Sequence, residues 1–187
     1  MFDWLSKGDN DAIAMLKKDH DTVKKLFDQF EEAQNRQAKR KIVNEALTEL
    51  KVHAVLEEEI FYPAVRKRIG ADIMNEADEE HHLAKVLIAE IEDLHGRGDH
   101  YDAKFTVLSE NVRHHIKEEE DELLPKAKAL DLDFEKLGRE MLRRREELLS
   151  EGFPATGEEA MVAATHSSGD SPAKAARKTN GNKRPSH

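Results

Sequence analysis

Apolar residues recur at every third or fourth position along four long segments of the chain, and this spacing predicts α-helices. An aromatic content of 5%, nine glycines and five prolines also favour a helical protein over a sheet protein. Four long helices with short connections predict an all-α fold, an antiparallel up-down-up-down four-helix bundle. The expected helices, with a short fifth one at the end, cover residues 11–34, 38–69, 72–95, 99–129 and 133–149.

The composition of the chain changes near residue 150. Residues 1–150 carry the helical pattern and are expected to form one domain, the helical bundle. Residues 151–187 are rich in Gly, Ala, Ser, Thr and Pro and lack a sustained apolar period, which predicts a disordered tail. The basic residues of this tail lie between Lys174 and Arg184. Weak binding to nucleic acid or to an acidic surface is therefore a hypothesis for the tail alone.

Charge and composition exclude several classes of function. The net charge of −9 argues against nucleic-acid binding by the bundle as a whole. No apolar run is long enough for a membrane span, and the first residues lack the pattern of a secretory signal, so a cytoplasmic protein is expected. The absence of cysteine excludes disulfides, thiolate metal sites and cysteine nucleophiles. Any metal site in this chain is therefore expected to be built from histidine and carboxylate side chains.

An internal repeat runs through the bundle. HAVLEEEIFYP at residues 53–63 aligns with HIKEEEDELLP at residues 115–125, so that a histidine, a glutamate four residues later and a proline coincide. DHDTVKKLF, which contains His20, aligns in the same way with EHHLAKVLI, which contains His81. The chain is therefore read as two copies of a helix pair. Each copy offers one lone histidine and one His-x-x-x-Glu.

Polar side chains interrupt the apolar stripe of each helix at these repeated positions. Burying them without partners would cost roughly 1–3 kcal/mol each. Imidazole and carboxylate together suit iron, zinc or manganese, and two carboxylates can bridge a pair of metals. The candidate metal ligands are His20, His53, Glu57, His81, His115 and Glu119. His82 and His114 lie one residue off the stripe and are read as flanking residues, with replacement of either neighbour as the alternative.

These segments resemble the hemerythrin-like proteins, whose domain is called the HHE cation-binding domain. The resemblance rests on Asp19-His20, on Glu80-His81 and on the two His-x-x-x-Glu segments that end in proline. It implies an antiparallel four-helix bundle around two non-haem iron ions, with zinc or manganese as possible substitutes. It also implies binding of dioxygen, or handling of nitric oxide, peroxide or iron.

One departure from the oxygen-carrying members of that family is at Lys85. Oxygen carriers place a histidine four residues after the lone histidine of the third helix, and here that residue is Lys85. The four-His two-Glu set resembles bacterial stress and iron-centre-repair members instead, although this chain lacks the cysteine-bearing region of the repair proteins. With one ligand fewer, each iron is expected to keep an open or water-filled position.

Two functional hypotheses follow. The alternative to both is a purely structural bundle whose affinity for metal is incidental. The first is a non-haem di-iron protein that binds dioxygen or handles nitric oxide or peroxide in a bacterial-type stress response. The second is a non-catalytic iron or redox sensor or store that acts through a partner. Whether the chain is an enzyme stays open at this point, and any activity would be di-iron redox chemistry on a small oxidant.

Overall fold

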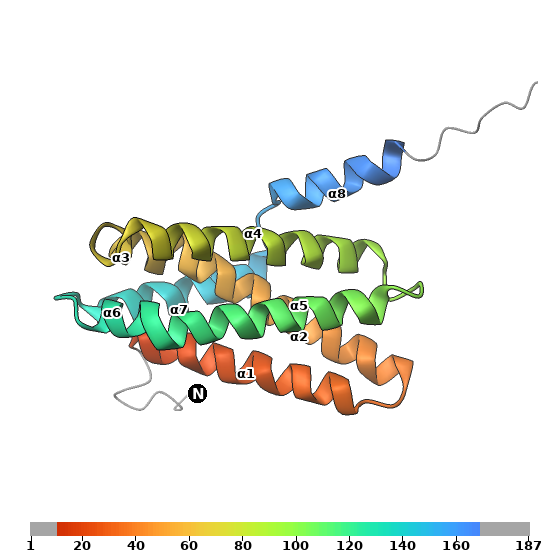
Figure 1. Ribbon diagram of the computed structural model, residues 1–187, viewed down its shortest axis with the longest axis horizontal. Coiled ribbons are helices and arrows are strands. Elements are labelled where there is room, and N and C mark those ends of the chain that lie inside the picture. The colour runs from red at the N-terminus through yellow and green to blue at the C-terminus, as the bar shows by residue number, and fades with distance from the viewer. Residues whose placement is uncertain (1–10, 169–187) are drawn as a thin grey trace, which may run out of the picture.

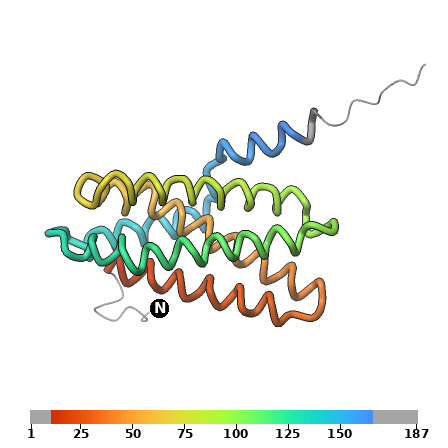
Figure 2. Tube along the Cα trace, in the orientation of Figure 1, coloured from red at the N-terminus to blue at the C-terminus, as the bar shows by residue number. Residues whose placement is uncertain are grey.

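The computed structural model describes residues 11–168, with side chains described through residue 165, and it confirms the all-α antiparallel bundle. Its long helical segments form four rods, which lie side by side in Figure 1, and Figure 2 traces the chain through them. No helix in the described range is both long and apolar enough to cross a lipid bilayer. The rods are α1 (Ala12–Glu32); α2 (Arg36–Leu56), η1 (Glu57–Phe61) and α3 (Tyr62–Ile69); α4 (Ala71–Asp93); and α5 (Tyr101–Glu118), η2 (Glu119–Leu123) and α6 (Leu124–Lys128).

Polar side chains and one glycine set the ends of these rods. Asp11 caps α1 by accepting a hydrogen bond from the Ala14 amide, and Asn35 caps α2 through the Ala38 amide. Gly70 separates α3 from α4 with a φ of 125°, a backbone conformation that glycine adopts without strain. The short connections that result force consecutive rods to run antiparallel.

A π-helical turn interrupts the second and fourth rods at equivalent places. η1 begins at Glu57 and is followed by Pro63, and η2 begins at Glu119 and is followed by Pro125. Proline has no amide hydrogen and crowds the turn before it, which loosens the α-helical ladder there. From the two prolines the sequence predicts a kink or loosened turn just past the ligand layer. In the structure each π-helical turn begins earlier, at the candidate glutamate itself.

Two hydrophobic clusters fill the bundle, one on each side of the candidate ligands. One cluster gathers Phe27, Phe30 and Phe105 with neighbouring aliphatic side chains. The other surrounds Phe61 and Met74 and extends to the helix that follows the bundle. The polar ligand layer lies between these clusters, so the apolar core on both sides holds it in place.

Two further helices follow the four rods. α7 (Phe134–Glu151), the expected fifth helix, lies against α1 and α2, and its Met141 and Leu148 are buried there. α8 (Gly157–Ser168) lies beside α4, on the outside of the bundle (Figure 1). Composition predicts disorder for this stretch, and that prediction is wrong for α8, because ion pairs to distant lysines and burial of Val162 hold it. The basic segment Lys174–Arg184 lies outside the described residues.

Candidate metal centre

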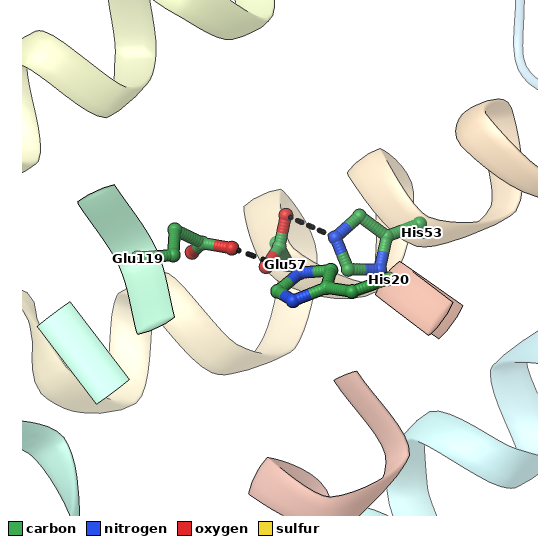
Figure 3. Close-up of side chains that lie close together, drawn as sticks. All are labelled: His20, His53, Glu57 and Glu119. Carbon is green, nitrogen blue, oxygen red and sulfur yellow. Dashed lines mark ion pairs between the residues drawn. The ribbon is translucent and has the colours of Figure 1, made fainter. Parts of the chain in front are cut away.

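The six residues marked by the sequence meet in one buried layer of the bundle. His20 of α1, His53 of α2, Glu57 of η1 and Glu119 of η2 form a first group, in which one donor atom from each lies within 4.8 Å of the others. Figure 3 shows these four side chains turned toward one another. All four are at most 7% exposed.

A second group lies next to the first and shares a member with it. Glu57, His81 of α4 and His115 of α5 also place one donor atom each within 4.8 Å of the others. His81 and His115 are 5% and 7% exposed. Glu57 thus belongs to both groups, which is the placement expected of a carboxylate between two metal positions.

Each buried carboxylate reaches one histidine of each half of the chain. Glu57 Oε2 lies 3.2 Å from the Nε2 atoms of both His53 and His81. Glu119 Oε2 lies 3.2 Å from His20 Nε2 and 3.7 Å from His115 Nε2. Four imidazole nitrogens therefore converge on two carboxylates from four different rods.

Several of these donor atoms have no hydrogen-bond partner among the described residues. They are His20 Nε2, His53 Nε2, both carboxylate oxygens of Glu57, and Glu119 Oε2. Leaving buried polar atoms unpaired costs roughly 1–3 kcal/mol each, more for a charged group. A cation bound among them would satisfy these atoms at once, so the residues present fit a pair of metal ions.

The Nδ1 atom of each of the four candidate histidines faces a carboxylate. These Nδ1–carboxylate distances are 2.9 Å for His20 to Glu120, 3.4 Å for His53 to Asp19, 2.9 Å for His81 to Glu58, and 2.7 Å for His115 to Glu80. A carboxylate at Nδ1 holds the proton there and directs the Nε2 lone pair inward, as metal-binding histidines require. The internal repeat thus extends to the residues behind the ligands.

Basic side chains hold these outer carboxylates in turn. Lys24 pairs with Glu120 at 3.2 Å, and Lys85, its equivalent in the repeat, pairs with Glu58 at 3.1 Å. Asp19 is paired with Arg145 of α7. Lys85, read from the sequence only as a missing histidine, therefore has a partner of its own and fixes the carboxylate that orients His81.

The two central carboxylates differ in their affinity for protons. Burial, followed by the negative charge of Glu119, raises the pKa of Glu57 well above its usual value. Burial would also raise the pKa of Glu119, but the close approach of His20 at 3.2 Å and the charges of His115 and His20 outweigh it and lower that pKa. Two carboxylates side by side in a buried site separate in this way unless a cation stabilises both charges.

The candidate histidines also differ in the direction in which their pKa values are shifted. Burial lowers the pKa of His53 from 6.5 to about 4, so this imidazole stays neutral and available as a ligand. For His115, burial is outweighed by the hydrogen bond to Glu80 and the charge of Glu119, and its pKa is raised.

Tyr62 is a residue of the centre that sequence reasoning missed. Its hydroxyl lies 3.2 Å from His81 Nε2 and donates a hydrogen bond to Glu119 Oε1 at 2.9 Å. Burial, then the charges of Glu57 and Glu119, raise the pKa of Tyr62, so the phenol keeps its proton in this arrangement. The oxygen stands where it could serve as a further ligand or as a hydrogen-bond donor to one.

The flanking histidines point away from the centre. His82 is 55% exposed and pairs with Glu158 of α8 at 2.8 Å. His114 is 62% exposed and pairs with Glu118 at 3.1 Å. Of each doublet, the member that the apolar stripe marks, His81 or His115, is the one that faces the other candidate ligands.

A small cavity lies on the histidine side of the centre. Its volume is about 40 Å³, which is room for one or two water-sized molecules. All four candidate histidines line it, together with apolar side chains such as Val23, Leu50, Ile88 and Val112. Asn111 also lines it, and the Oδ1 atom of Asn111 is buried without a hydrogen-bond partner in residues 11–165.

Comparison with known proteins agrees with this geometry. The model of the hemerythrin HHE cation binding domain family matches residues 11–127. A crystal structure of an HHE cation binding domain-containing protein from Mycobacterium kansasii superposes with a TM-score of 0.62 at 24% identity, over 76% of this chain and 94% of that one.

A curated relative, a protein from Nostoc sp. described as a DNA nickase, is 26% identical over 117 residues. The match covers 63% of this chain but only 33% of the relative, so the chain spans about a third of that protein's length. The family match, in contrast, contains all six candidate ligands and extends over more than half of the chain. The chain belongs to the hemerythrin HHE cation binding domain family.

Proposed function

We propose that this chain is a non-haem di-iron protein that handles a small oxidant, in a cytoplasmic stress response of bacterial type. The observation that carries the proposal is the pair of buried donor groups that share Glu57. His20, His53, Glu57 and Glu119 would hold one ion, and His81, His115 and the same two carboxylates the other. Zinc or manganese would fit the same donors, since imidazole and carboxylate accept all three metals.

The cavity limits what can react at this centre. A volume of about 40 Å³ suits a small molecule such as dioxygen, nitric oxide or hydrogen peroxide. Iron bound among the six ligands would supply electrons for reduction of such a molecule. The exposed area of the lining is almost entirely apolar, which lowers the local dielectric constant and strengthens electrostatic interactions inside.

Asn111 favours peroxide among these ligands. Asn111 lines the cavity, and its buried Oδ1 atom accepts no hydrogen bond from the described residues. Hydrogen peroxide carries a proton that can be donated to this oxygen, whereas dioxygen and nitric oxide carry none. Because an unpaired buried acceptor is costly, a ligand that satisfies it gains affinity.

Stopped-flow mixing of the anaerobic ferrous protein with peroxide, dioxygen or nitric oxide in turn tests the proposal. We expect a rapid absorbance change with peroxide, which slows about tenfold in Asn111→Leu while both metals are retained. Absence of reaction with all three in protein that holds two irons would contradict the proposal.

The second candidate, an iron or redox sensor acting through a partner, is favoured by a chain of contacts that links the centre to α8. Glu58 pairs with His81 at 2.9 Å and with Lys85 at 3.1 Å, and Glu158 of α8 lies 3.8 Å from Lys85. Loss of metal would free His81 to move, and this chain of contacts would carry the change to α8. Proteolysis of the α7–α8 connection that depends on iron loading would support this function, and equal cleavage with and without iron would oppose it.

A further inference from the structure

A second cluster of metal-ligand side chains lies outside the central layer. Glu80 of α4 with His114 and Glu118 of α5 place one donor atom each within 4.8 Å of the others. His114 Nε2 lies 3.1 Å from Glu118 Oε1 and 3.7 Å from Glu80 Oε1. His114 is largely exposed, and Glu80 is mostly covered, so the cluster extends from the protein surface inward.

Glu80 connects this outer cluster to the central layer. One of its oxygens faces His114, and the other accepts the hydrogen bond from Nδ1 of His115, a candidate ligand. A cavity of about 60 Å³ begins beside His114 at Glu80 and Glu118, which both line it, and Glu76 and Glu122 are also in its lining. His115 and Glu119 also line it. Glu119 is 2% exposed, and its Oε2 atom, which has no hydrogen-bond partner among the described residues, faces His20 and His115 in the central layer. The inner end of the cavity is therefore lined by a candidate ligand of the centre.

The internal repeat supplies a control within the same molecule. With His53 aligned on His115, the residues that correspond to His114, Glu118 and Glu122 are Val52, Leu56 and Ile60. With His20 aligned on His81, Met15 corresponds to Glu76. Met15, Val52 and Leu56 belong to one hydrophobic cluster with Met141 and Leu148 of α7, and Ile60 packs against it. Apolar side chains therefore cover this face of the first half.

We propose that Glu80, His114 and Glu118 form a transit site, at which a divalent cation is captured before it passes along the acidic cavity to the His81–His115 position. The inference rests on the proposed two-metal centre. Negative side chains along a cavity attract cations and raise their rate of association, typically by about 10–10³-fold. The imidazole of His114 adds a directional ligand that distinguishes a transition metal from sodium or magnesium.

The rate of Co²⁺ uptake by metal-free protein, followed by visible absorbance in a stopped-flow instrument, tests this site. Two double variants remove the outer cluster: His114→Val with Glu118→Leu, which copies the first half, and His114→Gln with Glu118→Gln, which keeps the surface polar. The matched control is His100→Gln with Glu110→Gln, since both residues are exposed and lie at the beginning and middle of α5. It changes charge by the same amount away from the cavity.

We expect uptake to slow at least about tenfold in both cluster variants and less than about twofold in the control. The final number of bound ions should stay at two in all of them. Equal rates in the cluster variants and the control would overturn the transit site, as would a final number below two, since that result would make His114 or Glu118 a ligand of the centre. Wild-type protein that binds fewer than two ions would instead contradict the two-metal proposal itself.

Discussion

The two halves of the bundle hold the centre with the same scaffold but enclose it differently. In the first half the rings of His20 and His53 lie 4.9 Å apart between centroids, and in the second half those of His81 and His115 lie 4.8 Å apart. Each of the four candidate histidines has a carboxylate at its Nδ1 atom. Lys24 and Lys85, four residues after the lone histidines His20 and His81, each pair with one of these carboxylates. The repeat is therefore preserved in the histidines, in the carboxylates at their Nδ1 atoms and in the lysines that pair with these carboxylates.

The surroundings of the halves diverge beyond that scaffold. α7 covers the first half, where Arg145 pairs with Asp19 and apolar side chains close the outer face. The corresponding face of the second half is open and acidic, and Tyr62 contacts His81 on its inner side. Under the two-metal proposal, this difference leads us to expect slow metal exchange at the covered position and faster exchange at the open one.

Removing a shared carboxylate should break both halves at once, and this is the largest effect that we predict. Glu57→Ala deletes the group that faces His53 and His81, so bound metal should fall from two ions to at most one. Metal analysis of the purified variant measures this. The control is Glu79→Gln, which changes an exposed glutamate of α4 two residues before His81 and should keep both ions. A Glu57→Ala protein with two ions would refute the bridging role.

The covered and the open half should respond differently to loss of the carboxylate behind a histidine. Asp19→Asn leaves the partly buried Arg145 without its closest charged partner and should lower the free energy of unfolding of metal-free protein by about 1–3 kcal/mol. Glu80→Gln faces an open cavity and should cost less than about 1 kcal/mol. Urea unfolding of both variants checks the order, and equal losses would argue against the structural difference between the halves.

Tyr62→Phe should affect one metal position more than the other. The substitution removes the hydroxyl beside His81 and Glu119 and keeps the buried ring, so we expect about tenfold weaker binding of one ion and little change for the other. Calorimetric titration with Co²⁺ separates the two steps. Tyr101→Phe, at the far end of the bundle, provides the matched control. Equal weakening of both binding steps would show that Tyr62 does not act selectively on the metal position of His81 and His115.

The smallest effect concerns proton binding in metal-free protein. Because burial lowers the pKa of His53 to about 4, this ring should stay neutral when the pH falls to 5, while His115, whose pKa is raised, becomes charged. The stability that His53 contributes is present above about pH 6.5 and is lost as the pH falls toward 4, whereas that of His115 is lost as the pH rises through its raised pKa. Histidine ring signals in an NMR titration report both, and the opposite order would contradict the burial argument.

The six candidate ligands and the bundle could be predicted from the sequence because each ligand interrupts an apolar stripe at a repeated position. Asp19 and Glu80, as well as Glu58 and Glu120, adjoin these ligands in both copies, so extension of the repeat by one residue would have found them. Tyr62 could not be found in this way. At roughly 100° per residue, five residues place it about 140° from Glu57, and only the π-helical turn brings it back to the centre.

α8 escaped prediction for a different reason. Its helix depends on partners far away in the chain, since Glu159 pairs with Lys51 at 3.2 Å and Glu158 with His82 at 2.8 Å. Local composition contains no trace of such contacts, and a segment rich in small residues reads as disordered when considered alone. The same holds for the ion pair of Arg145 with Asp19, which joins residues 126 positions apart.

The metal content and optical spectrum of aerobically purified protein test the central claim most directly. A di-iron centre built from four histidines and two shared carboxylates predicts two irons per chain and near-ultraviolet absorption from an oxo-bridged ferric pair. One iron or fewer in fully loaded protein, or a colourless protein that holds zinc, would contradict the assignment of this centre to paired iron.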